Sequence, residues 1–538
     1  MRRLWVGLGL LAVLILTTWP APWSPLSRGL GFAGMEAVDH LWALWAAGQA
    51  GPLVIDAPLI NYPVGYRWVL ADPLNLPWFM LGDRLGPGLG WNLVAWAGLS
   101  VGAVAAGLWA RAIAPDRPAA PAVAAAAALA LPPMAGSLHT GMSEVLTMGW
   151  AALALLGLAT LRPETPWRRV LLAGALCGVT AWGGPYTALY AVLGAVPLLV
   201  AGAWAARAAL AAWAARVGAI GLVAGALAAP VVYAVVVDRP RGLPGSDSSL
   251  PMVLADPGAP KNLMLGAEPL GLLWPLPGVE PLHAVFLGTI LAALALLGGI
   301  SRRAWGPLAA AGTLCVLGLG FVLQSGGQLV SWGGQPLGLP ALWLSEWLPP
   351  LGRAARWHRA VIPASLVLAG LAGVAAADLA ARAGRWRGAV LGGLAVLMVA
   401  EGLLRAPLGW PRPTFPVAPP DGYAALAPGP ILPLPLTRFS SGDPQQLRSP
   451  SLLWQASHGQ PLGGNPRQPG PRFRDPAVAG LAQQLLDGQP GAAAQLAELG
   501  FVWVLVQHDH DVRRLAAALG EPDVVEEGVW AWRLGQGM

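Results

Sequence analysis

Residues 4–20, LWVGLGLLAVLILTTWP, form an uninterrupted apolar run directly after Arg2 and Arg3. A helix crosses the roughly 30 Å hydrocarbon core of a bilayer with about 20 apolar residues, so this run predicts a membrane-spanning helix. Its basic start and apolar centre also fit a cleavable signal peptide. We favour a retained helix, because cleavage would leave the segment that follows without an anchor.

Runs of similar character continue along the 538-residue chain. Apolar residues make up 55% of the sequence and charged residues only 11%, whereas soluble domains contain about a quarter charged residues. We therefore predict a mainly α-helical protein, a polytopic membrane bundle of about eleven transmembrane helices. The approximate spans are 4–20, 89–110, 119–136, 143–161, 168–183, 186–205, 216–237, 282–300, 304–323, 361–381 and 387–406.

The arginines indicate the orientation of the bundle, because short cytoplasmic loops retain positive charge. With the N-terminus inside, the short inner segments are rich in arginine and contain only three acids, Asp116, Glu164 and Asp378. The net charge of +6 is then largely inner-loop arginine, so it does not indicate a nucleic-acid partner. We predict a protein of the cell inner (plasma) membrane with a cytoplasmic N-terminus. Its long outer loops are 21–88, 238–281 and 324–360.

The composition changes near residue 408. Residues 411–426, PRPTFPVAPPDGYAAL, are linker-like. Beyond them, strand-like runs such as FVWVLVQ (501–507) alternate with helix-like stretches such as PAVAGLAQQLLD (476–487). We predict two domains, a transmembrane domain over 1–407 and a small soluble α/β domain over 408–538 on the extracytoplasmic side.

Acidic residues of the first outer loop lie close to the first span. Glu36 and Asp39 are three residues apart, so on a helix they share a face, and His40 follows directly. A carboxylate at a low-dielectric boundary has a raised proton affinity and can act as a general base, and two carboxylates can bind a divalent cation. The alternative is the solvated face of an amphipathic helix in the membrane interface, which Trp42 and Trp45 also fit.

Three arginines of the last outer loop, Arg353, Arg356 and Arg359, recur at helical spacing where a basic helix enters the membrane. Guanidinium groups bind phosphate with two parallel hydrogen bonds, so this pattern suits a lipid phosphate at headgroup level. Ordinary interfacial anchoring is the alternative.

Two more ionisable residues, His139 and Glu144, flank the outer start of the fourth span, a place where such groups tend to serve function. Trp182, Tyr186 and Tyr190 also reach the outer side. They fit either a platform for sugar stacking or an aromatic belt, and we favour the belt.

In order and spacing these pieces resemble the GT-C superfamily of polytopic glycosyltransferases, specifically bacterial membrane proteins with a trailing outer domain. The resemblance covers nearly the whole chain. The segments that carry it are EAVDHLWALWAAG (36–48), NYPVGYRWVLADPLNLP (61–77), LGPGLGWNL (85–93), SLHTGMSEVLTMGW (137–150), GGQPLGLPALWLSEWLPPLGRAARWHRAVIPASLVLAGLAG (333–373), LGFVWVLVQHDHD (499–511) and VWAWRL (529–534).

The resemblance implies an enzyme whose donor is a hexose or pentose on a polyprenyl phosphate in the outer leaflet. An acid of the first outer loop would activate the acceptor hydroxyl of an envelope glycan, lipid or protein, with inversion at the anomeric carbon. Glu36 stands where relatives usually have an Asp six residues before the tryptophan, so both Glu36 and Asp39 remain candidates for the base.

The remaining implied roles concern substrate binding. The resemblance implies Arg353, Arg356 or Arg359 as the clamp for the lipid phosphate. It implies Tyr62 and Asp72 as loop neighbours and His139 as a group lining the site, and we add His40 and Glu144 to the substrate-binding candidates.

Two questions stay open at this point. Some GT-C enzymes use a metal and others do not, so a divalent cation such as Mg²⁺ or Mn²⁺ is neither required nor excluded. A transporter or flippase of lipid-linked glycans, or a non-catalytic protein of the same shape, is the alternative function. The lack of internal duplication and of polar residues within the spans disfavours transport.

Overall fold

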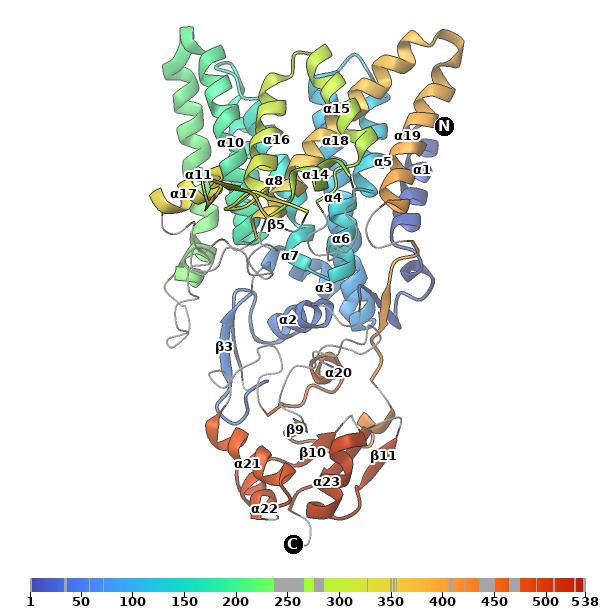
Figure 1. Ribbon diagram of the computed structural model, residues 1–538, viewed down its shortest axis with the longest axis vertical. Coiled ribbons are helices and arrows are strands. Elements are labelled where there is room, and N and C mark those ends of the chain that lie inside the picture. The colour runs from blue at the N-terminus through green and yellow to red at the C-terminus, as the bar shows by residue number, and fades with distance from the viewer. Residues whose placement is uncertain are drawn as a thin grey trace.

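The structure is a computed structural model with three regions along its long axis (Figure 1). A helical bundle occupies one end, α2 (Ala37–Ala50) and α3 (Leu76–Asp83) lie in the middle, and a C-terminal sheet with its helices occupies the other end. The described residues are 2–32, 36–57, 59–70, 72–236, 266–274, 285–326, 328–348, 351, 354, 356–405, 410–419, 421–434, 450–463, 475–489, 491–506, 509–526 and 529–535.

The bundle is built from apolar helices, as the sequence predicts. Within the described residues, six helical stretches are long and apolar enough to cross a membrane, and four shorter apolar helices accompany them. The total of eleven spans stays a prediction. The bundle helices are α1 (Arg2–Thr17), α4 (Pro87–Ile113), α5 (Ala120–Leu129), α6 (Pro132–Thr140), α7 (Ser143–Leu146), α8 (Met148–Ala159), α9 (Trp167–Trp182), α10 (Pro185–Ala205), α11 (Leu210–Val236), α15 (Thr289–Ser301), α16 (Trp305–Gly318), α18 (Val361–Arg382) and α19 (Arg387–Leu404).

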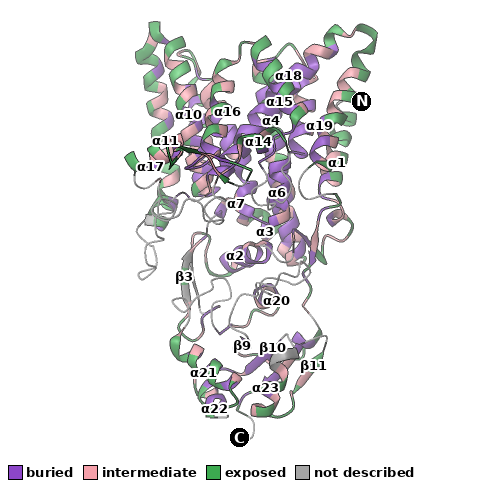
Figure 2. Ribbon diagram, in the orientation of Figure 1, coloured by how far each residue is buried: buried purple, intermediate pink, exposed green. Residues whose placement is uncertain are grey.

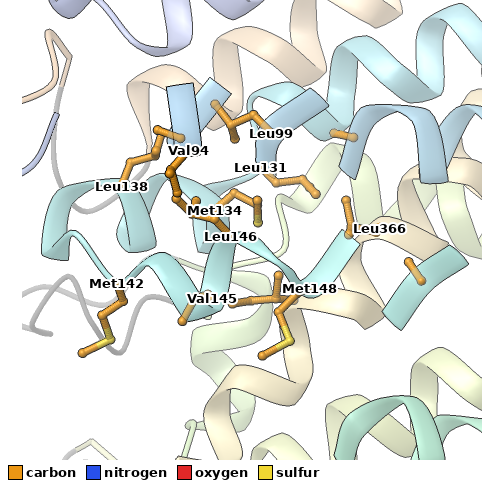
Figure 3. Close-up of a cluster of buried hydrophobic side chains, with 14 of the residues drawn as sticks. Val94, Leu99, Leu131, Met134, Leu138, Met142, Val145, Leu146, Met148 and Leu366 are labelled. Carbon is orange, nitrogen blue, oxygen red and sulfur yellow. The ribbon is translucent and has the colours of Figure 1, made fainter. Parts of the chain in front are cut away.

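Helix α18 forms the centre of the bundle and is buried along nearly its whole length (Figure 2). Its glycines allow this close packing. A Cβ on Gly370 would lie 2.6 Å from the Cβ of Trp109, and one on Gly373 would lie 2.7 Å from the carbonyl oxygen of Ala120. Larger side chains such as Leu366 fill the spaces between α4, α6, α7 and α8 (Figure 3). The core that supports the site elements α6 and α7 is therefore tightly packed.

Exposed tryptophans lie toward both ends of the bundle, as expected for the two interfaces of a membrane protein. At the end opposite α2 they accompany the arginine-rich turns, and the guanidinium carbons of Arg207, Arg216 and Arg385 lie 5.7, 5.2 and 5.5 Å from indole centroids. This placement accounts for much of the tryptophan excess. The exposed tryptophans are Trp5, Trp167, Trp204, Trp305 and Trp386 at that end, and Trp23, Trp78, Trp274, Trp332, Trp343, Trp347 and Trp410 toward the other.

The C-terminal region contains a four-stranded mixed sheet in the order β11-β12-β10-β9, in which only β9 and β10 are parallel. Alternate residues of β10 pack into two different hydrophobic cores. Trp503 and Leu505 join the core continuous with the bundle, whereas Val504 and Val506 pack in a second core with the C-terminal helices. The boundary at residue 408 and the extracytoplasmic location stay predictions. The elements are β9 (Ile431–Leu434), α20 (Pro450–His458), α21 (Pro476–Leu486), α22 (Gly491–Glu498), β10 (Trp503–Val506), α23 (Asp509–Leu519), β11 (Val524–Glu526) and β12 (Val529–Arg533).

The segment predicted as a linker is held along the first outer loop. Strand β8 (Thr414–Pro416) pairs antiparallel with β1 (Arg28–Leu30), and Arg28 Nε donates a 2.7 Å hydrogen bond to Thr414 Oγ1. The indole of Trp410 donates to the carbonyl of Leu16 at 2.7 Å. The start of the C-terminal region therefore fixes the loop that precedes α2.

The remaining short elements lie in the outer loops. They are β2 (Val54–Ala57), β3 (Tyr66–Val69), α14 (Pro269–Leu273), β4 (Gln324–Ser325), β5 (Gln328–Leu329), β6 (Ser331–Trp332), β7 (Gln335–Pro336) and α17 (Pro340–Trp347), with 3-10 helices at Ala21–Trp23, Pro73–Asn75, Arg207–Ala209, Trp357–Ala360, Gly384–Trp386 and Asp421–Tyr423.

Candidate functional site

Helix α2 presents the first-loop acids, but it is not the amphipathic interfacial helix that the sequence suggested. Ten of its residues between Ala37 and Ala47 are buried, on every side of the helix. The indole of Trp42 donates a 2.6 Å hydrogen bond to Gln455 of α20. The helix is thus enclosed by protein, and the amphipathic interpretation was wrong.

The start of α2 sits against the turn between α6 and α7. The backbone N–H of Glu36 donates to the carbonyl of Thr140 at 3.1 Å. Gly141 ends α6 in the left-handed conformation at φ +70°, and a Cβ there would overlap Ala37. Glycine at position 141 therefore allows the two loops that carry Glu36 and Glu144 to meet.

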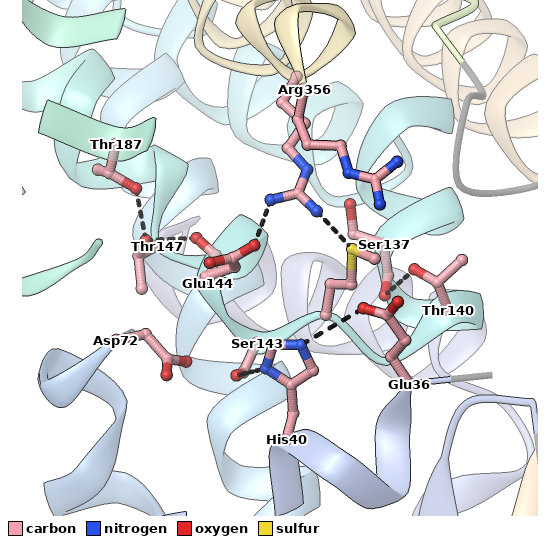
Figure 4. Close-up of polar contacts among 12 residues, drawn as sticks. Glu36, His40, Asp72, Ser137, Thr140, Ser143, Glu144, Thr147, Thr187 and Arg356 are labelled. Carbon is pink, nitrogen blue, oxygen red and sulfur yellow. Dashed lines mark hydrogen bonds and ion pairs between the residues drawn. The ribbon is translucent and has the colours of Figure 1, made fainter. Parts of the chain in front are cut away.

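His40 lies at the centre of the acidic side chains (Figure 4). Its Nδ1 is 2.9 Å from Ser143 Oγ, and its Nε2 is 3.8 Å from Glu36 Oε2. Burial alone would lower the pKa of His40, but the hydrogen bond with Glu36 and the negative charges of Asp72, Glu144 and Glu36 outweigh burial and raise the pKa. The imidazole is therefore favoured in its charged form.

Asp72 is brought to the same cluster by an amide that the sequence did not single out. Asn75 Nδ2 donates to Asp72 Oδ2 and to the carbonyl oxygen of Ser143, both at 2.9 Å. Burial raises the pKa of Asp72, although the charge of His40 and hydrogen bonds with Ser143 and Asn75 act in the opposite direction. Asn75 thus ties the first outer loop to the start of α7.

Arg359 supplies the opposite charge. Its Nη1 forms an ion pair with Glu144 Oε1, and its guanidinium carbon lies 5.1 Å from the ring centroid of Tyr186. Tyr190 donates a 2.5 Å hydrogen bond to the carbonyl of Arg356 and stacks on Tyr186 at 6.0 Å between centroids. The two tyrosines therefore position the arginine turn. Tyr190 is fully buried, so the aromatic-belt interpretation was wrong for this residue.

The arginines of the last outer loop do not share the face of one helix. Arg353 lies outside the described residues. Arg356 precedes the 3-10 helix Trp357–Ala360 with non-helical backbone angles, φ −128° and ψ 49°, and α18 begins only at Val361. The prediction of one basic helix was therefore wrong. Among the described residues Arg356 has no side-chain hydrogen bond or ion pair, whereas Arg359 is buried.

The other predicted residues have different surroundings. Asp39 is in the first turn of α2 and 3% exposed. His139 stacks on Phe32 with centroids 5.1 Å apart, and among the described residues its Nδ1 has no hydrogen-bond partner. Tyr62 packs edge-on against Phe501 of the C-terminal region at 5.3 Å. The cluster in Figure 4 thus contains Glu36, His40, Asp72, Glu144 and Arg356 together with Arg359, and not Tyr62.

The arrangement can bind an anion and accept a proton within one cluster. Within the described part of the chain, no group of three or more His, Cys, Asp or Glu side chains is placed to hold a metal ion. The groups that the described residues bring to the cluster are carboxylates, the imidazole of His40 and two guanidinium groups. Asn75 and Ser143 were missed, because a neutral side chain that bonds to a backbone carbonyl or an imidazole leaves no charge or spacing signal in the sequence.

Comparison with known proteins identifies the fold. A structure of ArnT from Cupriavidus metallidurans bound to undecaprenyl phosphate matches with a TM-score of 0.54 and 15% identity over 99% of this chain and 98% of that one. The apo structure of the same protein matches with a TM-score of 0.51 and 13% identity over 99% and 97%. No protein-family profile matches the sequence, and none of the curated proteins is similar to it in sequence. This chain therefore has the fold of these ArnT structures, in agreement with the fold that the resemblance to GT-C proteins implies.

Proposed function

We propose that this protein is a membrane glycosyltransferase that transfers a hexosyl or pentosyl group from a polyprenyl-phosphate donor to a hydroxyl group of an envelope glycan, lipid or protein. The observation that carries the proposal is the meeting of a first-loop carboxylate, Glu36, and the arginines of the last outer loop in one cluster. Group transfer from a lipid phosphate needs a base beside the acceptor and positive charge beside the leaving group. The similarity to ArnT with bound undecaprenyl phosphate supports the choice of donor.

Glu36 is the better candidate for the base. Its side chain is 28% exposed, whereas Asp39 is 3% exposed, so an acceptor hydroxyl can approach Glu36 more easily. Glu36 takes the hydroxyl proton while the acceptor oxygen attacks the anomeric carbon. The bond between that carbon and the phosphate oxygen breaks, and the phosphate leaves with the electron pair and inverted stereochemistry at the sugar. The charged His40 imidazole orients the carboxylate.

Arg356 and Arg359 would bind the phosphate. Arg356 has no side-chain partner among the described residues and is partly exposed, so it is available to a ligand. Arg359 is rigidly positioned by Tyr186 and Glu144. Two guanidinium groups stabilise the negative charge that develops on the leaving phosphate.

The proposed location is the inner (plasma) membrane, with the reaction at the outer face and residues 408–538 extracytoplasmic. The cluster lies toward the α2 end of the bundle, opposite the arginine-rich turns (Figure 1). The positive-inside rule places those turns in the cytoplasm, and hence the cluster outside.

The test compares Glu36→Gln with Asp39→Asn in an assay that follows sugar transfer from a lipid-linked donor. We expect Glu36→Gln to lower the transfer rate by about 10²- to 10⁴-fold, as for loss of a general base. Asp39→Asn retains most of the rate if Glu36 is the base. Thermal unfolding of both variants controls for stability. Normal product formation by both variants would overturn the catalytic assignment.

A further inference from the structure

The guanidinium group of Arg359 is buried, and its Nη atoms have partners whereas its Nε has none among the described residues. Its side chain is 4% exposed. Nη1 pairs with Glu144 Oε1, Nη2 contacts the sulfur of Met142, and the guanidinium stacks on Tyr186. Among the described residues Nε has no hydrogen-bond partner, although it is fully buried. The Nε–H donor of Arg359 is therefore unsatisfied among the described residues, and an acceptor from a bound ligand would satisfy it.

The backbone of Glu144 is held by a hydrogen-bonded turn, and its side chain is partly exposed. Thr147 Oγ1 donates to the carbonyl of Glu144 at 2.7 Å and is 2.8 Å from Thr187 Oγ1, which fixes the backbone to α10. The carboxylate itself is 16% exposed and, among the described residues, forms an ion pair with Arg359. Its charge also acts on His40, so the imidazole offers it a second partner if Arg359 binds another anion.

We propose that Glu144 is an internal competitor for the substrate phosphate, a carboxylate that occupies Arg359 in the empty site and is displaced as the lipid phosphate takes its place. The inference rests on the proposed function in one respect, the choice of a lipid phosphate as the ligand. A buried guanidinium needs an anion, so Glu144 serves as the partner of Arg359 when no ligand is present.

The competition favours one stage of the reaction. A sugar linked to a lipid phosphate is a phosphodiester with a single negative charge, the same charge as Glu144. When the bond to the sugar breaks, the phosphate becomes a monoester with a charge of about −1.5 to −2. Arg359 therefore gains most by exchanging Glu144 for phosphate as that charge develops. Such an exchange stabilises the transition state more than the bound donor, which is the requirement for catalysis.

The test measures binding of a polyprenyl phosphate to the full-length protein in lipid nanodiscs, with the corresponding polyprenol as a control for the tail. We expect Glu144→Gln to bind the phosphate about tenfold more tightly than the unsubstituted protein, because a charged competitor becomes neutral. Arg359→Lys should bind it about tenfold more weakly. Glu144→Asp, which keeps the charge but shortens the reach to Arg359, should lie between the unsubstituted protein and Glu144→Gln.

Asp83→Asn is the control, since it removes one negative charge from α3, outside the cluster and away from Arg359. We expect its affinity for the phosphate to stay within about twofold of the unsubstituted protein. Weaker or unchanged binding by Glu144→Gln overturns the competitor role while leaving the proposed function intact. Equal tightening by Asp83→Asn also overturns it, because general electrostatics would then explain the gain. If the unsubstituted protein does not bind the phosphate more tightly than the polyprenol, both the proposed function and the competitor role fail.

Discussion

Two arginine–carboxylate clusters lie toward opposite ends of the bundle, and they differ in how directly their charged side chains are paired. Away from α2, Asp378 Oδ1 accepts from Arg117 Nε at 2.7 Å and from Arg302 Nη2 at 2.5 Å, while Arg302 Nη1 donates to Asp116 at 3.0 Å. Two arginines meet two aspartates, and each arginine has an acidic partner. This arrangement ties α18 to the loops that follow α4 and α15.

The charges of the cluster beside α2 are paired less directly. Three carboxylates raise the pKa of His40, and Arg356 has no side-chain partner among the described residues. A charged side chain without a direct partner is costly in a fold, and such groups are common where a ligand binds. The comparison supports a structural role for the directly paired cluster and is consistent with the proposed function of the other.

The largest expected effect is a difference in transfer rate between variants of the two clusters. We expect Arg359→Lys to lower the rate of sugar transfer by about 10²- to 10³-fold, because a lysine cannot reproduce the bidentate contact with phosphate. Arg302→Lys should change the rate per folded molecule by less than about threefold, which is a modest effect on this scale. Transfer assays on both variants, normalised to folded protein, provide the measurement. Equal losses in the two variants would remove the functional distinction.

A second effect, on stability, should run the other way. Asp378→Asn removes the shared acceptor of two arginines, and we expect a loss of about 1–2 kcal/mol in the free energy of unfolding, since the arginines are partly exposed. Thermal unfolding should show a Tm lower by a few degrees with normal transfer per folded molecule. Asp116→Asn is the matched control, and because its side chain is about half exposed it should lower the Tm by less than Asp378→Asn does. A large loss of transfer by folded Asp378→Asn protein would contradict the structural role.

The smallest effect concerns pH. The pKa of His40 is raised above its usual 6.5, so its contribution to stability is complete below about pH 6.5 and is lost as the pH rises through the folded pKa. The hydrogen bond with Arg302 lowers the pKa of Asp116 below its usual 3.8. The contribution of Asp116 to stability is therefore complete above about pH 3.8 and does not change near neutral pH. As the pH rises above about 6.5 we expect a slight fall of the Tm that disappears in His40→Gln. The same slope in both proteins would show that His40 does not titrate there.

The sequence predicted the charged members of the site better than their geometry. Glu36, His40, Asp72, Glu144, Arg356 and Arg359 stand out because charge is scarce beside apolar spans. Helical spacing gave a wrong prediction at Arg356, because the backbone there is not helical and a 3-10 helix follows. The prediction of an interfacial helix at α2 was wrong, because the helix is buried by distant parts of the chain. Gln455, for example, is 413 residues from its partner Trp42, and hydrophobic periodicity cannot detect such a contact.

The pairing of β1 with β8 joins two segments that are synthesised far apart in time. Arg28 and Thr414 are 386 positions apart, and a ribosome adding about 5–20 residues per second needs roughly 20 to 80 s to cover that distance. Throughout that interval the loop that carries Glu36 lacks its partner strand. The pair can form only after the helices between Arg28 and Thr414 have been synthesised, so this part of the fold is completed late in synthesis.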